Sequence, residues 1–283
     1  MDDQGNSAEP LSRRAFAALS AAAAASAMAT PAAGASAMAM DVEIKTPDGV
    51  CDAALIHPAG EGRWPAVLVW PDAYGLRPTF REMGARLAGE GYVVLVVNQF
   101  YRSRKAPVFA GPVNFSEPKT REALMELRKP LTPETVARDG AAFLAFLDGQ
   151  KVVNARAKAG VAGYCMGGAM TLQAAAALPS RIGAGCSFHG GGLVTDGPDS
   201  PHLLVPRIKA SYYFGVAAND DAKEPQAKEV LKAAFAAAKV PARIEVYSES
   251  QHGWCVPDSP VYNKPDAERA WGEMLALYKA ALV

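Results

Sequence analysis

Residues 159–178 read AGVAGYCMGGAMTLQAAAAL, and this stretch decides the fold. The small apolar residues at 159–162 predict a buried strand, and the alanine-rich residues up to Leu178 predict a helix. Between them, GYCMG at 163–167 has the spacing of a nucleophile elbow, G-x-S-x-G, with Cys in the position of Ser. A turn this sharp needs small flanking residues, and glycine meets that need. The stretch therefore predicts strand, elbow and helix, with Cys165 at the tip.

The position of Cys165 predicts a reactive thiol. The predicted helix begins directly after it, and a helix N-terminus stabilises a thiolate. A nucleophilic cysteine is therefore the functional interpretation. The alternative is a buried cysteine in a glycine-rich turn that serves packing or phosphate binding.

Apolar runs and amphipathic stretches alternate along the rest of the chain. Residues 41–45 and 51–57 flank the turn sequence at 47–49 and predict a hairpin. Thr132 and Pro133 have the pattern of a helix start. Further strands are predicted at 66–70, 93–97, 183–188, 210–216 and 243–247, and helices at 78–89, 122–127, 133–147, 225–238 and 266–281. Strands that alternate with helices predict a single α/β domain, in which helices cover both faces of a mostly parallel central sheet.

Two polar loops follow later strands in the order expected for a catalytic acid and base. Asp220 and Asp221 follow the strand predicted at 210–216, and His252 follows the strand predicted at 243–247. Behind an elbow nucleophile, this order gives a Cys-His-Asp triad, in which the histidine moves the proton and the aspartate orients it. Either aspartate can supply the acid, and Asp220 is preferred. The alternatives are a turn histidine beside a glycine and a solvated turn aspartate.

The first 39 residues have the features of an export signal. SRRAF at 12–16 is a twin-arginine signature, and a weakly apolar stretch follows at 17–29. Small-residue cleavage sites of the A-x-A type occur within 27–39. We therefore expect residues 1–39 to direct export by the twin-arginine translocase to the periplasm or beyond, and to be removed or disordered. Residues 40–283 would then form the folded domain. The alternative is an alanine-rich disordered tail or a marginal helix.

Composition and charge weigh against several classes of function. Arg plus Lys and Asp plus Glu number 29 each, so the formal net charge is zero and predicts no nucleic-acid partner. No segment approaches the ~20 apolar residues of a stable membrane anchor. The four cysteines form no C-x-x-C pair and the histidines lack ligand spacing, so we predict no metal and no cofactor. A disulfide between Cys51 and Cys255 is conceivable in an exported protein.

These features together resemble the dienelactone hydrolase family of α/β-hydrolases. The resemblance rests on the cysteine elbow, the aspartate loop at 219–225, the His-Gly-Trp segment at 252–254 with Tyr262, and PDAYGL at 71–76 after the first long buried strand. It implies the α/β-hydrolase fold. It also implies carboxymethylenebutenolidase-like activity, which is the cleavage of small esters or lactones.

The resemblance also implies roles for residues beside the triad. In the family, a carboxylate in the loop after the first buried strand helps to deprotonate the cysteine, and Asp72 occupies that position where the best-known members carry Glu. Two backbone N–H groups form the oxyanion hole, and they correspond to Ala73 and Met166. The spacing of the aspartate loop resembles that of relatives with a longer loop, which supports Asp220.

Substrate contacts are inferred from the same resemblance. Family members that open dienelactones hold a substrate carboxylate with arginines, and Arg102 follows the second buried strand, where such a contact could arise. The alternative for Arg102 is a solvated loop charge. Tyr101 and Trp254 are candidates for the pocket wall, with core packing as the alternative. We expect an enzyme whose partner is a small ester or lactone. The alternative is a non-catalytic thiol redox or ligand-binding protein on a hydrolase scaffold.

Overall fold

Eight strands form one sheet in the order β1-β2-β4-β3-β5-β6-β7-β8, across the residues that the computed structural model describes (36–109, 111, 113 and 117–282). The pairs β1–β2 and β2–β4 are antiparallel and the remaining pairs are parallel, which confirms the predicted mostly parallel sheet. The strands are β1 (Ala37–Thr46), β2 (Gly49–Pro58), β3 (Ala66–Trp70), β4 (Val93–Val97), β5 (Ala159–Tyr164), β6 (Ile182–Phe188), β7 (Ser211–Ala217) and β8 (Ala242–Tyr247).

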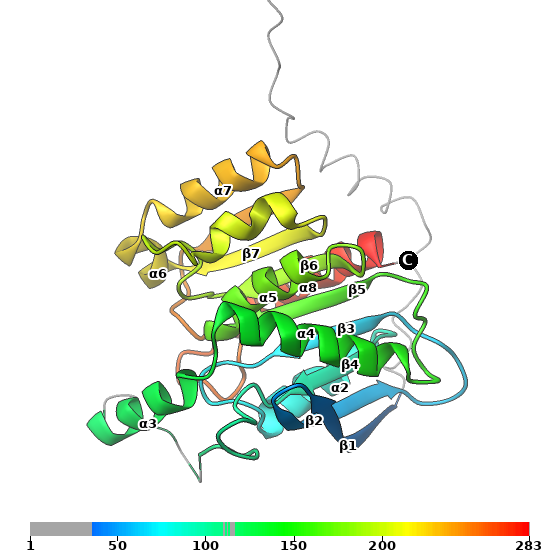
Figure 1. Ribbon diagram of the computed structural model, residues 1–283. Coiled ribbons are helices and arrows are strands. Elements are labelled where there is room, and N and C mark those ends of the chain that lie inside the picture. The colour runs from blue at the N-terminus through cyan, green and yellow to red at the C-terminus, as the bar shows by residue number, and fades with distance from the viewer. Residues whose placement is uncertain (1–35, 110, 112, 114–116, 283) are drawn as a thin grey trace, which may run out of the picture. The chain divides into compact units, whose positions relative to one another are not determined.

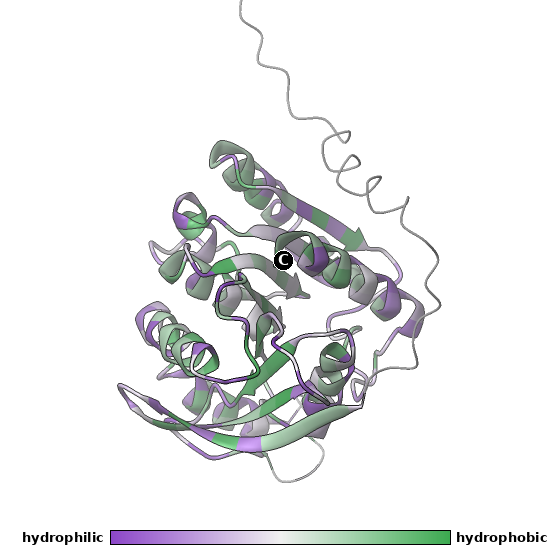
Figure 2. Ribbon diagram, turned by 90° about the vertical axis from the view of Figure 1, so that its right-hand side faces the viewer, coloured by the Kyte–Doolittle hydropathy of each residue, from purple (hydrophilic) through white to green (hydrophobic). Residues whose placement is uncertain are grey.

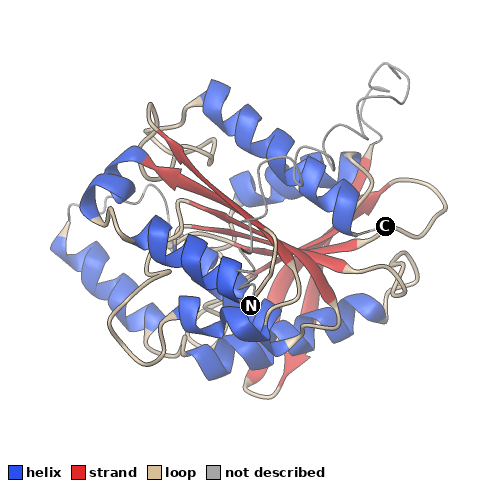
Figure 3. Cartoon of the chain, turned by 90° about the horizontal axis from the view of Figure 1, so that it is seen from above, coloured by secondary structure: helices blue, strands red, loops and turns tan. Residues whose placement is uncertain are grey.

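Helices cover both faces of the sheet (Figure 1 and Figure 3). They are α2 (Pro78–Gly89), α3 (Pro118–Arg128), α4 (Pro133–Asp148), α5 (Met166–Ala177), the 3-10 helix η1 (Pro201–Arg207), α6 (Ala218–Lys223), α7 (Ala227–Ala237) and α8 (Lys264–Ala281). The core on one face is formed with α4, α5 and α7, and the core on the other face with α2 and α8. No helix in the described ranges combines the length and apolar character needed to cross a bilayer.

Strand β3 shows why a continuous apolar run lies at the centre of the sheet. Leu68 and Trp70 pack into the core shared with α4 and α5, whereas Val67 and Val69 pack into the core shared with α2 and α8. Every residue of β3 is buried, because a strand covered on both faces has no solvent side. Figure 2 shows the hydrophobic colour on the central strands and hydrophilic residues on the outer surfaces of the helices.

All predicted helices and strands are present, but some boundaries differ, and α3 begins at Pro118 and not at residue 122. β1 begins at Ala37, which pairs with Pro58, so the folded domain starts at least three residues before the predicted boundary at residue 40. Helices η1 and α6 were not predicted, because seven and six residues are too few to show a helical period. The start of α4 is as predicted: the Thr132 side chain accepts a hydrogen bond from the Thr135 N–H, and Pro133 is the first helical residue.

The order of the strands brings two loops together at one edge of the sheet. From β3 the chain passes to β4 on one side, while β5 pairs with the other side and aligns Trp70 with Gly163. In open α/β sheets, ligands bind beyond the carboxyl ends of the strands at such a reversal. The segments that begin at Pro71 and at Cys165 therefore meet where a site is expected.

Candidate active site

Cys165 lies at the tip of a strained elbow between β5 and α5. Its backbone has φ 54° and ψ −121°, a conformation that residues with side chains rarely adopt. A Cβ on Gly163 would lie 2.1 Å from the carbonyl oxygen of Gly167, and a Cβ on Gly167 would lie 2.3 Å from that of Trp70. The Cys165 N–H donates to the Phe188 carbonyl at 3.1 Å, which ties the elbow to β6. Close packing against the neighbouring strands therefore imposes the strained conformation.

His252 follows β8 and is held by the segment that follows β7. Its backbone N–H donates to the side-chain oxygen of Asn219 at 2.8 Å, and its Nδ1 lies 2.7 Å from Oδ2 of Asp220. Of the two aspartates that the sequence left open, Asp220 is therefore the one in contact with the imidazole. Asp221 instead pairs with Lys228 at 2.6 Å.

The contacts of His252 favour its charged form. Burial opposes protonation, but hydrogen bonds with Asp220 and with Cys165 outweigh it and raise the pKa of His252 to about 10. The imidazole is therefore protonated at neutral pH, beside the sulfur of Cys165. A cation at this position stabilises a thiolate, which is the nucleophilic form of cysteine.

His189 is a further histidine of this site, which the sequence analysis did not place in the catalytic set. It follows β6 with a positive φ of 40°, and its ring centroid lies 4.8 Å from that of His252. Its Nδ1 accepts the Cys165 N–H at 3.1 Å. Burial and the neighbouring His252 hold the pKa of His189 well below its ordinary value, which favours the neutral ring. Because Nδ1 accepts a hydrogen bond, the proton of the neutral ring is assigned to Nε2. The sequence signal that could have identified it is a histidine at a predicted strand end, directly before three glycines at 190–192.

Replacing His189 by Phe is expected to lower kcat about fivefold with little change in KM. An aromatic ring remains, but the Cys165 N–H, which is shared between the Phe188 carbonyl and His189, loses its second acceptor, a hydrogen bond worth about 1 kcal/mol. The matched control is His189→Asn, because Asn tolerates a positive φ and offers a side-chain oxygen near the same N–H. Steady-state kinetics on both variants measures the difference. Equal kcat values for the two variants would show that the acceptor has no role.

A pocket of about 840 Å³ contains Cys165 and His252. Asp72 and Ala73 line it from the loop after β3, as the predicted activation and oxyanion residues should. The Asp72 carboxylate, however, accepts hydrogen bonds from the Arg77 guanidinium at 2.7 and 2.9 Å. Met166 is the first residue of α5, where a backbone N–H has no acceptor within its own helix.

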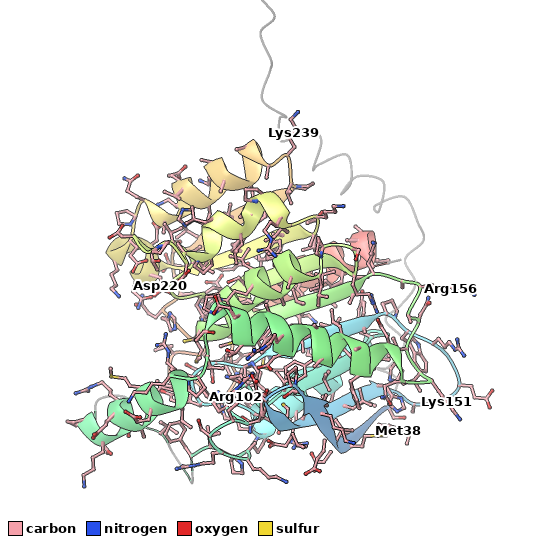
Figure 4. All side chains as sticks on the ribbon, in the orientation of Figure 1. Met38, Arg102, Lys151, Arg156, Asp220 and Lys239 are labelled. Atoms are coloured by element: carbon pink, nitrogen blue, oxygen red, sulfur yellow. The ribbon has the colours of Figure 1, made fainter. Side chains whose placement is uncertain are left out.

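The structure places Tyr101 and Arg102 away from this pocket. Arg102 donates to the buried Asp139 at 2.7 and 2.8 Å and pairs with Asp48 at 2.6 Å, and Tyr101 also donates to Asp139. Figure 4 labels Arg102 and Asp220 in separate regions of the molecule. The prediction that these two side chains contact substrate is therefore corrected: they tie the β1–β2 turn to α4.

Trp254 also has a different position from the one predicted. Its side chain is fully buried, and its ring centroid lies 5.3 Å from that of His189. It packs behind His189 and not on the pocket surface. Trp254 therefore packs against the buried side of the His189 ring.

The four cysteines are all free, so the disulfide considered between Cys51 and Cys255 is not formed. Burial raises the pKa of Cys51, Cys186 and Cys255, which disfavours their thiolates. Cys165 is the partly exposed member of the set. Among the described residues, no group of His, Cys, Asp or Glu side chains has the arrangement of a metal site.

Comparisons with known proteins give similar sequences and a similar fold. The sequence profile of the dienelactone hydrolase family matches residues 51–282. A "putative carboxymethylenebutenolidase" from Synechocystis sp. is 27% identical over 81% of this chain and 91% of its own length. A carboxymethylenebutenolidase from Pseudomonas putida is 22% identical over 78% of this chain and 88% of its own length. The crystal structure of a "putative dienelactone hydrolase" from Klebsiella pneumoniae has a TM-score of 0.75 and 21% identity, and covers 86% of this chain and 98% of that chain.

Proposed function

The chain belongs to the dienelactone hydrolase family, and from this premise we propose that it cleaves small esters or lactones through an acyl-cysteine intermediate on Cys165. The observation that supports the proposal is that Cys165 and His252 line one pocket while Asp220 contacts the imidazole of His252 at 2.7 Å. A nucleophile, a proton carrier and an orienting carboxylate in that order are the groups that acyl transfer needs.

The proposed first half-reaction forms a thioester. The Cys165 thiolate attacks the carbonyl carbon, and the N–H groups of Ala73 and Met166 donate to the resulting oxyanion, each such donor being worth about 3–4 kcal/mol. As the carbon–oxygen bond of the ester breaks, protonated His252 donates its proton to the leaving alkoxide. With a lactone substrate, that alkoxide stays attached to the acyl group.

The second half-reaction returns the enzyme to its starting state. Neutral His252 takes a proton from water, whose oxygen attacks the thioester carbon. The carbon–sulfur bond breaks, the acid leaves, and the thiolate–imidazolium pair forms again. Asp220 orients the imidazole in both steps and stabilises its charged form. We assign activation of the thiol to His252, since Arg77 and the Tyr74 N–H hold the Asp72 carboxylate.

Turnover of p-nitrophenyl acetate and a panel of small lactones, including cis- and trans-dienelactone, tests the proposal. We expect hydrolysis, an acyl group on the Cys165 peptide by mass spectrometry, and loss of turnover once iodoacetamide has labelled that residue. Labelling of Cys165 in a protein that turns over no ester or lactone would instead favour a non-catalytic thiol function.

The activity should have an alkaline limit near pH 10. The folded-state pKa of His252 is about 10, against an ordinary 6.5, so the proton that the leaving group needs is lost as the pH rises through that value. Folding stability depends on pH in the same direction, because the folded state holds this proton more tightly than the unfolded state. The contribution of His252 to the free energy of unfolding is complete below pH 6.5 and disappears as the pH rises toward 10. The pH profile of kcat/KM measures the limit.

Asp220→Asn should move this limit to lower pH, because the carboxylate bond that favours the imidazolium is removed. Asp221→Asn is the matched control, since its partner is Lys228 and not the imidazole. A limit that stays near pH 10 in the Asp220 variant would exclude this aspartate as the source of the shift.

We also propose that residues 1–39 direct export by the twin-arginine translocase, from the arginine pair at 13–14. Cleavage after Ala29 would leave β1 intact, whereas cleavage after Ala39 would remove its first three residues. A reporter fused to residues 1–39 should reach the periplasm, and replacement of both arginines by Lys should keep it inside. Equal export of the two fusions would contradict the proposal.

A further inference from the structure

The charged side chains of the pocket form one compact cluster beside the thiol. Asp72 and Arg77 come from the segment between β3 and α2, and Asp258 comes from the segment between β8 and α8. Arg77 is the one Arg or Lys among the described residues that line the pocket. Whether the site can hold a substrate carboxylate therefore depends on whether this guanidinium is available.

The guanidinium of Arg77 has no donor left for a substrate. It carries five N–H groups, and five hydrogen bonds to the protein use them. Two go to the Asp72 carboxylate at 2.7 and 2.9 Å, two to the Asp258 carboxylate at 2.7 and 2.9 Å, and one to the Gly75 carbonyl at 3.3 Å. Arg77 is thus a bridge between two carboxylates.

Packing fixes this bridge in place. The Arg77 side chain is 15% exposed, and its guanidinium carbon lies 5.4 Å from the ring centroid of Tyr74 and 4.9 Å from that of Phe80. Burial opposes its charge, but the bonds with Asp258 and Asp72 outweigh that effect and raise the pKa of Arg77 above its ordinary value. Releasing the guanidinium toward a ligand would leave two carboxylates without their shared partner.

The cluster also gives the pocket a negative net charge. Among the described lining residues two carboxylates oppose one guanidinium, and the imidazolium of His252 is paired with the carboxylate of Asp220 directly behind it. The phenol of Tyr74 is affected by the same negative charges: burial, Asp72 and the Cys165 sulfur raise its pKa. An anionic substrate would lose hydration on entry and meet repulsion, and the described lining residues include no guanidinium or ammonium group with a free donor to compensate.

We infer that the site is built for uncharged esters or lactones, and that Asp258 determines this specificity by holding Arg77 away from a substrate carboxylate. The inference rests on the proposed hydrolase function and names its substrate class. It departs from the substrate contacts that the family resemblance implies, in which arginines bind a carboxylate of the substrate.

A matched pair of esters tests the inference on the full-length protein. The 4-nitrophenyl monoester of glutaric acid carries a free carboxylate, and its methyl ester is uncharged with the same acyl chain and leaving group. We expect wild-type kcat/KM to be at least about tenfold higher for the uncharged ester. In Asp258→Asn, the lost negative charge and the donor released on Arg77 should shift this ratio about tenfold toward the anionic ester.

Asp148→Asn is the matched control, because Asp148 is also a half-exposed aspartate paired with an arginine, Arg181, outside the pocket. It should leave the ratio unchanged. A wild-type preference for the anionic ester, or an unchanged ratio in Asp258→Asn, would overturn the inference while leaving hydrolysis established. If the wild type hydrolyses neither ester, the proposed function is overturned, and the inference with it.

Discussion

Replacing Cys165 by Ala is expected to lower kcat/KM for ester hydrolysis by about 10⁴-fold or more, the size of effect seen when a nucleophile is removed from a triad. The loss follows from the proposed mechanism, in which Cys165 forms the bond to substrate. The fold should survive, since Ala retains the Cβ and experiences the same backbone strain at φ 54°. Steady-state kinetics and circular dichroism on the same preparation separate the two effects.

Cys255→Ala is the matched control for this experiment. Cys255 is a buried free thiol in the core formed with α2 and α8, and burial raises the pKa of its thiol. Its removal should leave kcat/KM within about twofold of the wild type, although a small cavity lowers stability. Ester hydrolysis at the wild-type rate by the Cys165→Ala variant would end the acyl-cysteine mechanism.

Replacing Gly163 by Ala is expected to destabilise the protein by at least about 3 kcal/mol, which a marginally stable domain survives poorly. The added Cβ would lie 2.1 Å from the carbonyl oxygen of Gly167 and 2.8 Å from the nitrogen of Gly168. Both atoms belong to backbone in the tightest part of the elbow, so they cannot rotate away. Denaturant titration measures the free energy of unfolding, or shows that soluble protein is lost.

Gly272→Ala gives the opposite expectation and serves as the control. Gly272 lies in α8, and no atom lies within 4 Å of a Cβ placed there. Alanine in an exposed helix interior is about 1 kcal/mol more favourable than glycine, so this variant should be more stable than the wild type. Equal stability of the two alanine variants would show that the elbow contacts are not the source of the constraint.

Much of the fold could be predicted because its patterns are local. The apolar runs of β3 and β4 have no polar residue, which indicates strands buried on both faces. The glycine spacing around Cys165 predicts the elbow because the close contact at Gly163 is with Gly167, four residues away; the contact of Gly167 with Trp70 of β3 could not be read from this spacing. Short helices such as α6 could not be predicted, since they lack a full period of the helical pattern.

The parts of the site that depend on the order of the strands could be predicted. The parts that depend on ion pairs between residues far apart in the sequence could not. Cys165, Asp220 and His252 follow the parallel strands β5, β7 and β8, so parallel topology alone brings them to one edge. Arg102 and Arg77 both follow buried strands and look equivalent in sequence. Their partners lie far along the chain, at Asp139 for Arg102 and at Asp258 for Arg77. The sequence does not show that Arg77 is the arginine in the pocket. It also does not show that carboxylates of the protein already bind its guanidinium.

The positive φ of Cys165 has a consequence for how this protein responds to selection. Glycine adopts that backbone conformation without strain, so a Cys165→Gly substitution would relieve about 1–3 kcal/mol while removing the thiol. Resistance to unfolding therefore favours glycine at position 165, whereas reactivity favours cysteine. A library screened for heat resistance alone would drift toward glycine there, and a screen that also demands turnover would hold cysteine.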